Sequence, residues 1–241
     1  MPERQLSDEA RRLLKSVSVA TLTTCLFKRG LKNQLIQGVA PINPNAPRMV
    51  GEAYTLRTIP AREDLTTMAA IADRKYPQRA AIEDCPPGHV LVIDSRKDAR
   101  AASGGDILLT RLMVRGVAGA VTDGGFRDSP EIARLQFPSY QARPAPPISL
   151  ILHNAVETQV PIGCGDAPVY PGDIVVGDGE GVVVVPEAIA EEIANEAFEQ
   201  TAYEDFVVDK VKEGRPIFGL YPASDAAKAE FALWRKEKGR R

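Results

Sequence analysis

Three charged residues, Asp106, Arg127 and Asp128, have the types and spacing of a site for small anions or metal ions. Asp106 follows Gly104-Gly105 and begins an apolar segment of helical period, whereas Arg127 and Asp128 follow the sharp turn Asp123-Gly124-Gly125. In an α/β unit, the loops at the carboxyl ends of strands face helix N-termini, where anionic ligands bind. We therefore expect the three side chains to share one crevice.

The segment from Ser103 to Glu131 contains the elements that would hold these side chains in place. Asp106 is a suitable N-cap for a helix over residues 107–114, and the apolar run 117–122 predicts a short strand. Asp128-Ser129-Pro130-Glu131 is similar to a capping box with proline in the first turn. Asp128 therefore has two interpretations, as a helix cap or as a residue that carries chemistry.

Elsewhere the apolar pattern predicts a chain in which helices and strands alternate. The expected helices cover residues 6–14, 17–27, 62–76 and 187–213, and the expected strands cover 49–58, 137–142 and 182–185. Ser7 and Ser16 are the expected caps of the first two helices, and Pro77 is expected to end or kink the third. Arg79 is interpreted as part of a solvated helix face, with substrate binding as the alternative. We predict an α/β layered domain with a mixed sheet and flanking helices.

Two segments, residues 86–94 and 170–178, have closely similar patterns. Each has a Pro-Gly turn that leads into an apolar strand, and the strands end at Asp94 and Asp178. Two copies are too few for a solenoid, so the echo indicates a sheet-rich layered domain. The two aspartates are interpreted as turn residues at strand ends.

The composition is that of a globular protein without a basic surface for nucleic acid. With 241 residues, 44% of them hydrophobic, the chain is long enough for one large domain. The net charge of -2 and the pI of 5.8 argue against binding to nucleic acid through bulk charge, and residues 236–241 are interpreted as a solvated basic tail. Because no apolar run could span a bilayer and no signal peptide is recognisable, we expect a cytoplasmic protein with no membrane partner.

The cysteines and histidines limit the kind of metal site that the chain can form. The three cysteines are odd in number and far apart, which predicts neither a disulfide framework nor a zinc-thiolate site. The two histidines, His89 and His153, are too few for a histidine-rich site. A metal would therefore bind oxygen ligands, which favours Mg²⁺ or Mn²⁺ over zinc.

Asp106, twenty intervening residues and Arg127-Asp128 form a D-x20-R-D pattern. This pattern resembles the RraA-like family, specifically its metal-dependent 4-hydroxy-4-methyl-2-oxoglutarate and 4-carboxy-4-hydroxy-2-oxoadipate aldolases. The framework R-G-V-A-G-A-V-T-D-G-G-F-R-D is similar to the family's R-G-x-x-G-x-V-x-D-G-x-x-R-D. The likeness continues in residues 171–178 and 181–186 and extends over residues 56–221.

The resemblance implies a fold, a domain organisation and an assembly. The fold would be the swivelling β/β/α fold of RraA-like proteins. A single domain would cover residues 1–241, with helices in 1–30 and a C-terminal helix and tail in 187–241. The assembly would be a homotrimer, or a homohexamer built from trimers.

A glutamate from the C-terminal helix would, by the same resemblance, reach the metal-water shell of a neighbouring subunit. When the helix is aligned with the family by Gly214 and Tyr221, Glu204 falls at this position. Glu199 and Asp205 lie close by in the sequence. The chain departs from the aldolases at residues 148–157, where they carry a shorter basic and glycine-rich loop. Within this segment, His153-Asn154 is interpreted as a turn, with substrate contact as the alternative.

The implied activity is cleavage of a 4-hydroxy-2-oxo acid to pyruvate and a second carbonyl compound. Oxaloacetate decarboxylation would be a side activity through the same enolate. The reaction needs positive charge at the developing oxyanion, which Arg127 and a divalent metal held by Asp128 would supply. Asp106 would orient metal-bound water. The residues expected to bind the substrate carboxylate at the helix start are Gly105, Ile107 and Leu108.

Three other functions are compatible with parts of the sequence. A Schiff-base aldolase needs a desolvated lysine, and the nearest candidate, Lys97, has charged neighbours that favour exposure. A dehydratase acting on a related 2-oxo sugar acid is the second alternative. The third is a non-catalytic regulator that binds a ribonuclease, because the RraA-like family includes such proteins. The complete Arg127-Asp128 pair favours an enzyme.

Overall fold

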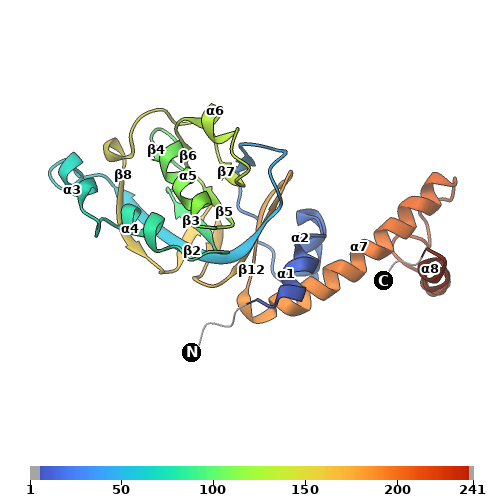
Figure 1. Cartoon of the computed structure of the whole chain (residues 1–241). Coiled ribbons are helices and arrows are strands. Elements are labelled where there is room, and N and C mark those ends of the chain that lie inside the picture. Colours follow the sequence, from blue (N-terminus) through green and yellow to red (C-terminus); the bar gives the residue numbers. More distant parts are fainter. Residues whose placement is uncertain (1–5, 239–241) are drawn as a thin grey trace.

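A computed structural model describes residues 6–238 and shows a curved mixed sheet with helices packed outside it (Figure 1). The strands of the main sheet are β1 (Ala40–Pro41), β2 (Met49–Pro60), β3 (Val90–Asp94), β5 (Gly119–Thr122), β7 (Ser139–Gln141), β8 (His153–Thr158), β11 (Ile174–Asp178) and β12 (Gly181–Val185). Their order is β1-β7-β5-β3-β2-β11-β12, and β8 also pairs with β2. The central strands β2, β3, β5 and β7 are parallel, and the outer pairings are antiparallel. The predicted α/β class is confirmed.

Two short pairs of strands and a set of helices complete the fold. The pairs are β4 (Ala102–Gly104) with β6 (Gly125–Phe126), and β9 (Ile162–Cys164) with β10 (Ala167–Val169). The helices are α1 (Asp8–Leu14), α2 (Val19–Lys28), α3 (Met68–Ala72), α4 (Pro77–Asp84), α5 (Asp106–Val114), α6 (Ser129–Ile132), α7 (Ala190–Lys212) and α8 (Asp225–Glu237), with 3-10 turns η1 (Ser149–Ile151) and η2 (Glu187–Ile189).

Hydrophobic side chains form separate clusters on the two faces of the sheet. One cluster joins α1, α2 and the first half of α7 to β11 and β12. A second joins α4 and α5 to β2, β3 and β5. A third fills the space enclosed by the curved sheet, between β3, β9, β10 and β12. Continuous β-branched runs such as Val182–Val185 are buried on both sides, which explains why they lack the alternation of a half-exposed strand.

The two similar segments, residues 86–94 and 170–178, form the strands on either side of β2. β3 pairs with β2 in parallel, and β11 pairs with it antiparallel. The two Pro-Gly turns adopt the same left-handed backbone, with φ of 80° at Gly88 and 88° at Gly172. Glycine suits this conformation because it has no Cβ to clash with the backbone.

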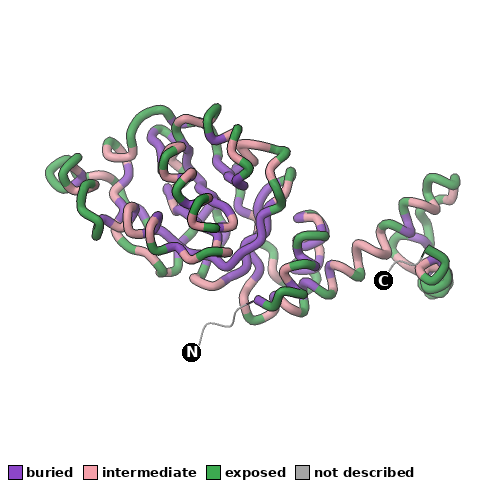
Figure 2. The backbone as a smooth tube through the Cα atoms, viewed as in Figure 1, coloured by how far each residue is buried: buried purple, intermediate pink, exposed green. Residues whose placement is uncertain are grey.

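The second half of α7 leaves the sheet and carries α8 with it (Figure 1). We call residues 203–238 the C-terminal arm and the rest of the described chain the sheet body. The arm has its own small core of Phe206, Val207, Leu220, Ala227 and Trp234. Figure 2 shows that burial is concentrated in the sheet body, whereas much of the arm is exposed.

Several predicted boundaries were wrong for local reasons. Ser18, not Ser16, caps α2, because its hydroxyl accepts a hydrogen bond from the Thr21 N–H. The predicted helix over 62–76 is reduced to the short α3, and Pro77 begins α4 instead of ending a helix. Proline suits the first turn of a helix, where its missing N–H needs no partner.

The C-terminal region also differs from the prediction of one helix followed by a tail. The predicted helix over 187–213 is confirmed as η2 followed by α7, but a further helix, α8, forms after Ser224, whose hydroxyl caps it. Lys236 lies in the last turn of α8, and residues 239–241 of the predicted basic tail lie outside the described residues. Within residues 6–238, no helix is long and apolar enough to cross a membrane.

Candidate functional site

The short parallel pair β4 and β6 brings the predicted site residues together. Ala102 pairs with Gly125 and Gly104 with Phe126, so the chain leaves β4 toward Asp106 beside the point where it leaves β6 toward Arg127. The Arg127 N–H donates to the Gly104 carbonyl at 3.0 Å. Backbone pairing therefore places side by side two segments that are separated by twenty residues in the sequence.

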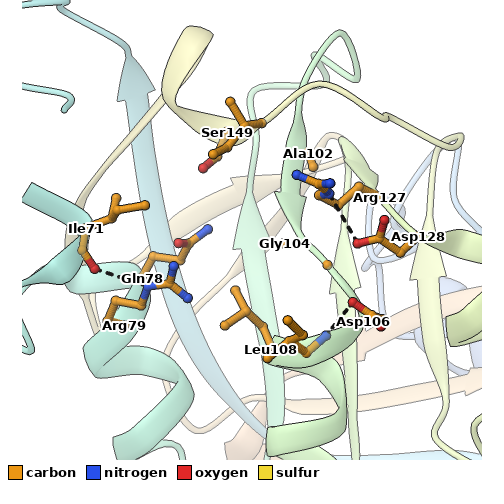
Figure 3. Close-up of a pocket in the computed structure, with 13 residues that line it drawn as sticks. Ile71, Gln78, Arg79, Ala102, Gly104, Asp106, Leu108, Arg127, Asp128 and Ser149 are labelled. Carbon is orange, nitrogen blue, oxygen red and sulfur yellow. Dashed lines mark hydrogen bonds and ion pairs between the residues drawn. The ribbon is translucent and has the colours of Figure 1, made fainter. Parts of the chain in front are cut away.

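A pocket of about 380 Å³ opens at this point. It is lined by Ile71, Gln78, Arg79, Ala102, Gly104, Gly105, Asp106, Ile107, Leu108, Arg127, Asp128, Ile148 and Ser149. Figure 3 shows α4 on one wall and the Arg127-Asp128 segment on the opposite wall. The prediction that Asp106, Arg127 and Asp128 share one crevice is confirmed.

Asp128 adopts a left-handed backbone conformation with φ of 58°, at the N-cap position of α6. The capping-box interpretation correctly placed Asp128 at the N-cap of a helix. It was wrong about the side chain, which makes no capping hydrogen bond. Aspartate tolerates this conformation better than most residues, yet non-glycine residues held there often serve a function. The carboxylate is thus available to the pocket.

Arg127 and Asp128 form an ion pair at the pocket wall. The Arg127 Nε donates to Asp128 Oδ2 at 3.2 Å, and the two side chains are 44% and 35% exposed. These exposures show that both groups can meet a ligand. The pair also borders a second cavity of about 470 Å³, with walls that include Pro41, Pro130 and Pro146.

Gly105 leaves room for the Arg127-Asp128 ion pair, which lies close to its backbone. A Cβ at position 105 would lie 2.8 Å from Asp128 Oδ2 and 2.9 Å from the Arg127 Cγ. Both distances are shorter than carbon contacts in folded proteins allow, so any larger residue would displace the ion pair. Gly105 therefore shapes the pocket by having no side chain.

The start of α5 forms the floor of the pocket, with one correction to the prediction. Gly105 is the N-cap and Asp106 is the first helical residue. The Asp106 Oδ1 accepts a hydrogen bond from the Ile107 N–H at 2.8 Å, and the Leu108 N–H donates to the Gly105 carbonyl at 3.1 Å. The predicted carboxylate-binding amides therefore have intramolecular partners, which an incoming carboxylate has to replace.

A profile of the RraA-like family, described as Aldolase/RraA, matches residues 5–184 of this sequence. The chain belongs to the RraA-like family. The match includes the whole pocket and ends within β12, so the arm lies beyond it.

The relatives of this RraA-like protein carry different names. It is 32% identical over 182 residues to a protein of Halalkalibacterium halodurans provisionally named as a 4-hydroxy-4-methyl-2-oxoglutarate aldolase, with 75% of this chain and 80% of that protein covered. The crystal structure of Streptomyces coelicolor RraAS2, titled an unusual member of the RNase ES inhibitor RraA protein family, is 32% identical with a TM-score of 0.74, covering 85% of this chain and 98% of that one.

A further solved structure shares the fold over most of the chain. An uncharacterized protein from Pseudomonas syringae pv. tomato superposes with a TM-score of 0.81 at 22% identity, covering 93% of this chain and 98% of that one. The family match and the RraAS2 structure confirm the predicted RraA-like fold.

Buried polar groups fix the loops behind the pocket of the RraA-like protein. Asp123 accepts hydrogen bonds from the N–H groups of Ser95, Lys97 and Gly165, at 2.7, 3.0 and 3.2 Å. Ser95, Ser103 and Thr122 form a closed ring of hydroxyls with oxygen-oxygen distances of 2.7–2.9 Å. These bonds join the ends of β3, β4 and β5, which hold the site.

His153 lies in β8 and not in a turn, which corrects the prediction for His153-Asn154. Its Nε2 lies 3.3 Å from the Ala101 carbonyl and its Nδ1 3.3 Å from Arg96 Nη2. Burial lowers the pKa of His153, and the hydrogen bond to Ala101 opposes this effect only in part. The side chain is buried and contacts the carbonyl of Ala101, which precedes Ala102 of the pocket wall.

Gln78 and Arg79 are among the pocket residues that were not predicted as site residues. Gln78 is buried, and its Nε2 donates to the Ser103 carbonyl at 2.6 Å, which ties α4 to the loop before Gly105. The Arg79 Nε donates to the Ile71 carbonyl at 3.3 Å. The sequence signal for both was Pro77, which fixes the start of α4 and hence the residues of its first turn.

Two other residues named from the sequence lie outside the pocket. Glu204 is half-buried on α7, where it accepts hydrogen bonds from Thr21 Oγ1 at 3.2 Å and Gln200 Nε2 at 2.9 Å. Its predicted contact is with another subunit, so it stays a prediction. Lys97 is exposed and paired with Asp166, an arrangement that does not provide the desolvated amine of a Schiff-base enzyme.

Asp128 suits a hard divalent cation that retains several waters. Among residues 6–238, no three His, Cys, Asp or Glu side chains lie close enough to form a protein cage for a metal. Mg²⁺ commonly binds through one or two carboxylates and keeps water in its other positions. A half-exposed carboxylate without a capping role fits this type of binding.

Proposed function

We propose that this RraA-like protein is a lyase that cleaves a 4-hydroxy-2-oxo acid into pyruvate and a second carbonyl compound, with Mg²⁺ or Mn²⁺ as cofactor. The main support is the Arg127-Asp128 pair, which lies beside the start of α5 in a pocket of substrate size. The name of the Halalkalibacterium relative points to the same class of reaction.

Arg127 binds the negative charge of the substrate in this proposal. Its Nε is held by Asp128, while its terminal N–H groups remain available for a carboxylate or a carbonyl oxygen. Retro-aldol cleavage places negative charge on the 2-oxo oxygen as the carbon-carbon bond breaks. A guanidinium fixed beforehand at that position stabilises the transition state more than the ground state.

The floor of the pocket binds the substrate carboxylate. The first amides of α5 lie at the positive end of the helix, where an anion is favoured. When a substrate carboxylate takes the Ile107 N–H, the Asp106 carboxylate loses its present partner. Asp106 then accepts a proton or positions a water beside the reacting carbon atoms.

Asp128 would hold the divalent cation, and the cation would supply Lewis-acid stabilisation of the developing charge. Oxaloacetate decarboxylation would accompany the cleavage, because both reactions produce the enolate of pyruvate. A site that stabilises the enolate of a 2-oxo acid would also allow dehydration of a 2-oxo sugar acid, in which a base removes a proton from C3 and the C4 hydroxyl leaves as water. A screen of substrates separates these cases.

A second candidate function is inhibition of a ribonuclease. It is favoured by the likeness to RraAS2, whose title names the RNase ES inhibitor family. An inhibitor needs no intact Asp128 carboxylate in its pocket. Catalytic turnover that depends on Asp128 therefore separates the two functions.

The test is pyruvate release from 4-hydroxy-2-oxo acids and oxaloacetate, with and without Mg²⁺ or Mn²⁺. Asp128→Asn should reduce kcat/KM by about 100-fold or more, because it removes the charged metal ligand. The melting temperature should change little, since Asp128 caps no helix through its side chain.

Asp64→Asn is the matched control. Asp64 pairs with the nearby Arg62 at 2.7 Å on the surface, outside the pocket, and should keep full activity. Normal turnover in Asp128→Asn, or undiminished turnover in excess chelator, would contradict the metal-dependent mechanism. No turnover of any substrate by the wild type would favour the inhibitor.

A further inference from the structure

The wall of the pocket opposite Arg127 contains a second arginine. Arg79 lies in the first turn of α4, and Figure 3 shows its side chain across the pocket from Arg127 and Asp128. It comes from a different element than the loops at β4 and β6, and the interpretation as a solvated helix face does not explain its position in the pocket.

Arg79 has no carboxylate within ion-pair distance among residues 6–238. The acidic residues that follow it on α4 are already paired, Glu83 with Arg111 at 2.8 Å and Asp84 with Arg74 at 3.4 Å. Within the described part of the chain, the Arg79 side chain donates a hydrogen bond from Nε to the Ile71 carbonyl. This hydrogen bond to α3 orients the planar guanidinium of Arg79, and the terminal N–H groups stay available for a ligand.

The helix that carries Arg79 is held firmly in the fold. The neighbouring Gln78 is buried and bonded to the Ser103 carbonyl, and α4 packs against α5 and β8. Arg79 as a residue is half-buried, so an anion bound beside it would be partly shielded from water. Hydrogen bonds to a charged group are stronger under such shielding than on an open surface.

The charges that line the pocket also indicate more than one anionic group. Arg79 and Arg127 offset Asp106 and Asp128, so the lining is neutral as it stands. A divalent cation on Asp128 would leave two positive charges, which two carboxylates would neutralise. The apolar side chains of Ile71, Leu108 and Ile148 lie between these polar ends and suit a short carbon chain.

We propose that Arg79 is a specificity-determining residue that binds a second anionic group, at the end of the substrate remote from Arg127. The substrate in the name of the Halalkalibacterium relative is a dicarboxylic 2-oxo acid, and Arg79 is the residue of this chain that recognises the second carboxylate of such a substrate. This inference rests on the proposed lyase function and assigns a residue to the recognition of the substrate tail.

Two substrates of equal chain length test the inference. 4-Hydroxy-2-oxoglutarate ends in a carboxylate, and 4-hydroxy-2-oxopentanoate ends in a methyl group. For Arg79→Gln, kcat/KM should fall by roughly 10- to 100-fold on the dicarboxylate, the usual loss for a hydrogen bond to a charged group. It should change little on the neutral substrate. Arg74→Gln, which alters an exposed arginine beside α4, should leave both values unchanged.

Binding of inert analogues separates failure of the inference from failure of the lyase function. 2-Oxoglutarate and 2-oxopentanoate lack the C4 hydroxyl and cannot undergo retro-aldol cleavage. Calorimetry should show tighter binding of 2-oxoglutarate to the wild type, and Arg79→Gln should remove that preference. If this result appears without pyruvate release from any substrate, the binding of an anion by Arg79 would be supported and the lyase function would be contradicted.

Equal losses on both substrates would show that Arg79 only supports α3, and would overturn the inference. So would an unchanged preference for the dicarboxylate in Arg79→Gln, or the same loss of preference in Arg74→Gln. Arg79→Lys provides a second variant that keeps the charge, and it should recover part of the preference lost in Arg79→Gln. No recovery in a folded Arg79→Lys, together with equal losses in Arg79→Gln, would again indicate a structural role.

Discussion

The sheet body and the C-terminal arm are stabilised in different ways. The body buries apolar side chains in three clusters and fixes its loops with buried hydrogen bonds around Asp123. The arm relies on one small aromatic cluster, in which Phe206 contacts Tyr203, Phe231 and Trp234 with ring centroids 5.7 Å apart. Exposed ion pairs such as Arg235 with Glu199 add little to stability.

This difference indicates which part of the molecule can open without loss of the site. Segments with few buried contacts unfold locally at a lower free energy than the core. The pocket is made entirely by the sheet body, whereas the arm exposes large apolar residues such as Phe218, which is 90% exposed. We therefore expect the arm to open first, and the following predictions test this contrast.

Phe206→Ala should produce the largest effect, and it should be confined to the arm. Phe206 is fully buried, and its loss should cost about 3–5 kcal/mol of local stability. Hydrogen exchange should become faster throughout α8, while protection of β2 and β3 is retained. Val208→Ala, at an exposed position of the same helix, is the control. Equal loss of protection in the sheet would show that body and arm unfold as one unit.

Arg127→Lys tests the chemical role of the body. Lysine keeps the charge but cannot reproduce the planar fork, so kcat should fall by about 100-fold with no change in hydrogen exchange. Pyruvate release is the measurement, and Arg62→Lys, in an exposed pair with Asp64, is the matched control. Near-normal turnover would reduce Arg127 to a partner in a surface ion pair.

Glu204→Gln tests whether the arm contributes to a neighbouring site. Glu204 lies at the base of the arm, and the loss of an outer-shell proton acceptor commonly costs about 10- to 100-fold in activity. Oligomer size and secondary structure should not change. Full activity of the variant would remove Glu204 from the site and leave Glu199 or Asp205 to be tested.

Mixed oligomers make the same prediction sharper. An inactive Asp128→Asn chain combined with an inactive Glu204→Gln chain should regain some activity, because an intact Asp128 can then face an intact Glu204 from another subunit. Mixed assembly has to be shown by size and by differential tags. Failure of verified mixed oligomers to recover activity would contradict a shared site.

The smallest expected effect is a pH dependence that originates in the sheet body, which contains both histidines. Because burial lowers the pKa of His153, the unfolded chain binds a proton more readily than the folded protein. Stability should therefore fall as the pH decreases through about 6.5, by at most about 1.4 kcal/mol per pH unit. Urea unfolding of His153→Gln should show a weaker dependence. An unchanged dependence would assign the effect to other groups.

Sequence reasoning was most successful where chemistry and backbone geometry impose the same residue. The glycines and charges of the D-x20-R-D pattern were sufficient to place Asp106, Arg127 and Asp128 in one pocket. The pattern could not show that Asp128 has a left-handed backbone, since a capping box and this conformation use the same residue types. It also could not place Arg79, because the distance between α4 and β6 depends on tertiary packing.

The arm shows the same limit at the level of the fold. The helical period of α7 was readable over its full length, but α8 was not predicted. Its stabilising contacts join Phe206 to Phe231 and Trp234, which lie more than twenty residues away in the sequence. Local periodicity does not report such contacts. Ser224, whose hydroxyl accepts from the Ala227 N–H, was the local signal that this helix begins.

The hydroxyl ring of Ser95, Ser103 and Thr122 has two possible proton arrangements. Each oxygen can donate to one neighbour and accept from the other, in either sense of rotation. In both senses every hydroxyl donates one hydrogen bond and accepts one, so none of the three is left without a partner. The polar support of this pocket therefore satisfies its own hydrogen bonds, and it joins the strands behind Gly104 without relying on the charge of a ligand in front of it.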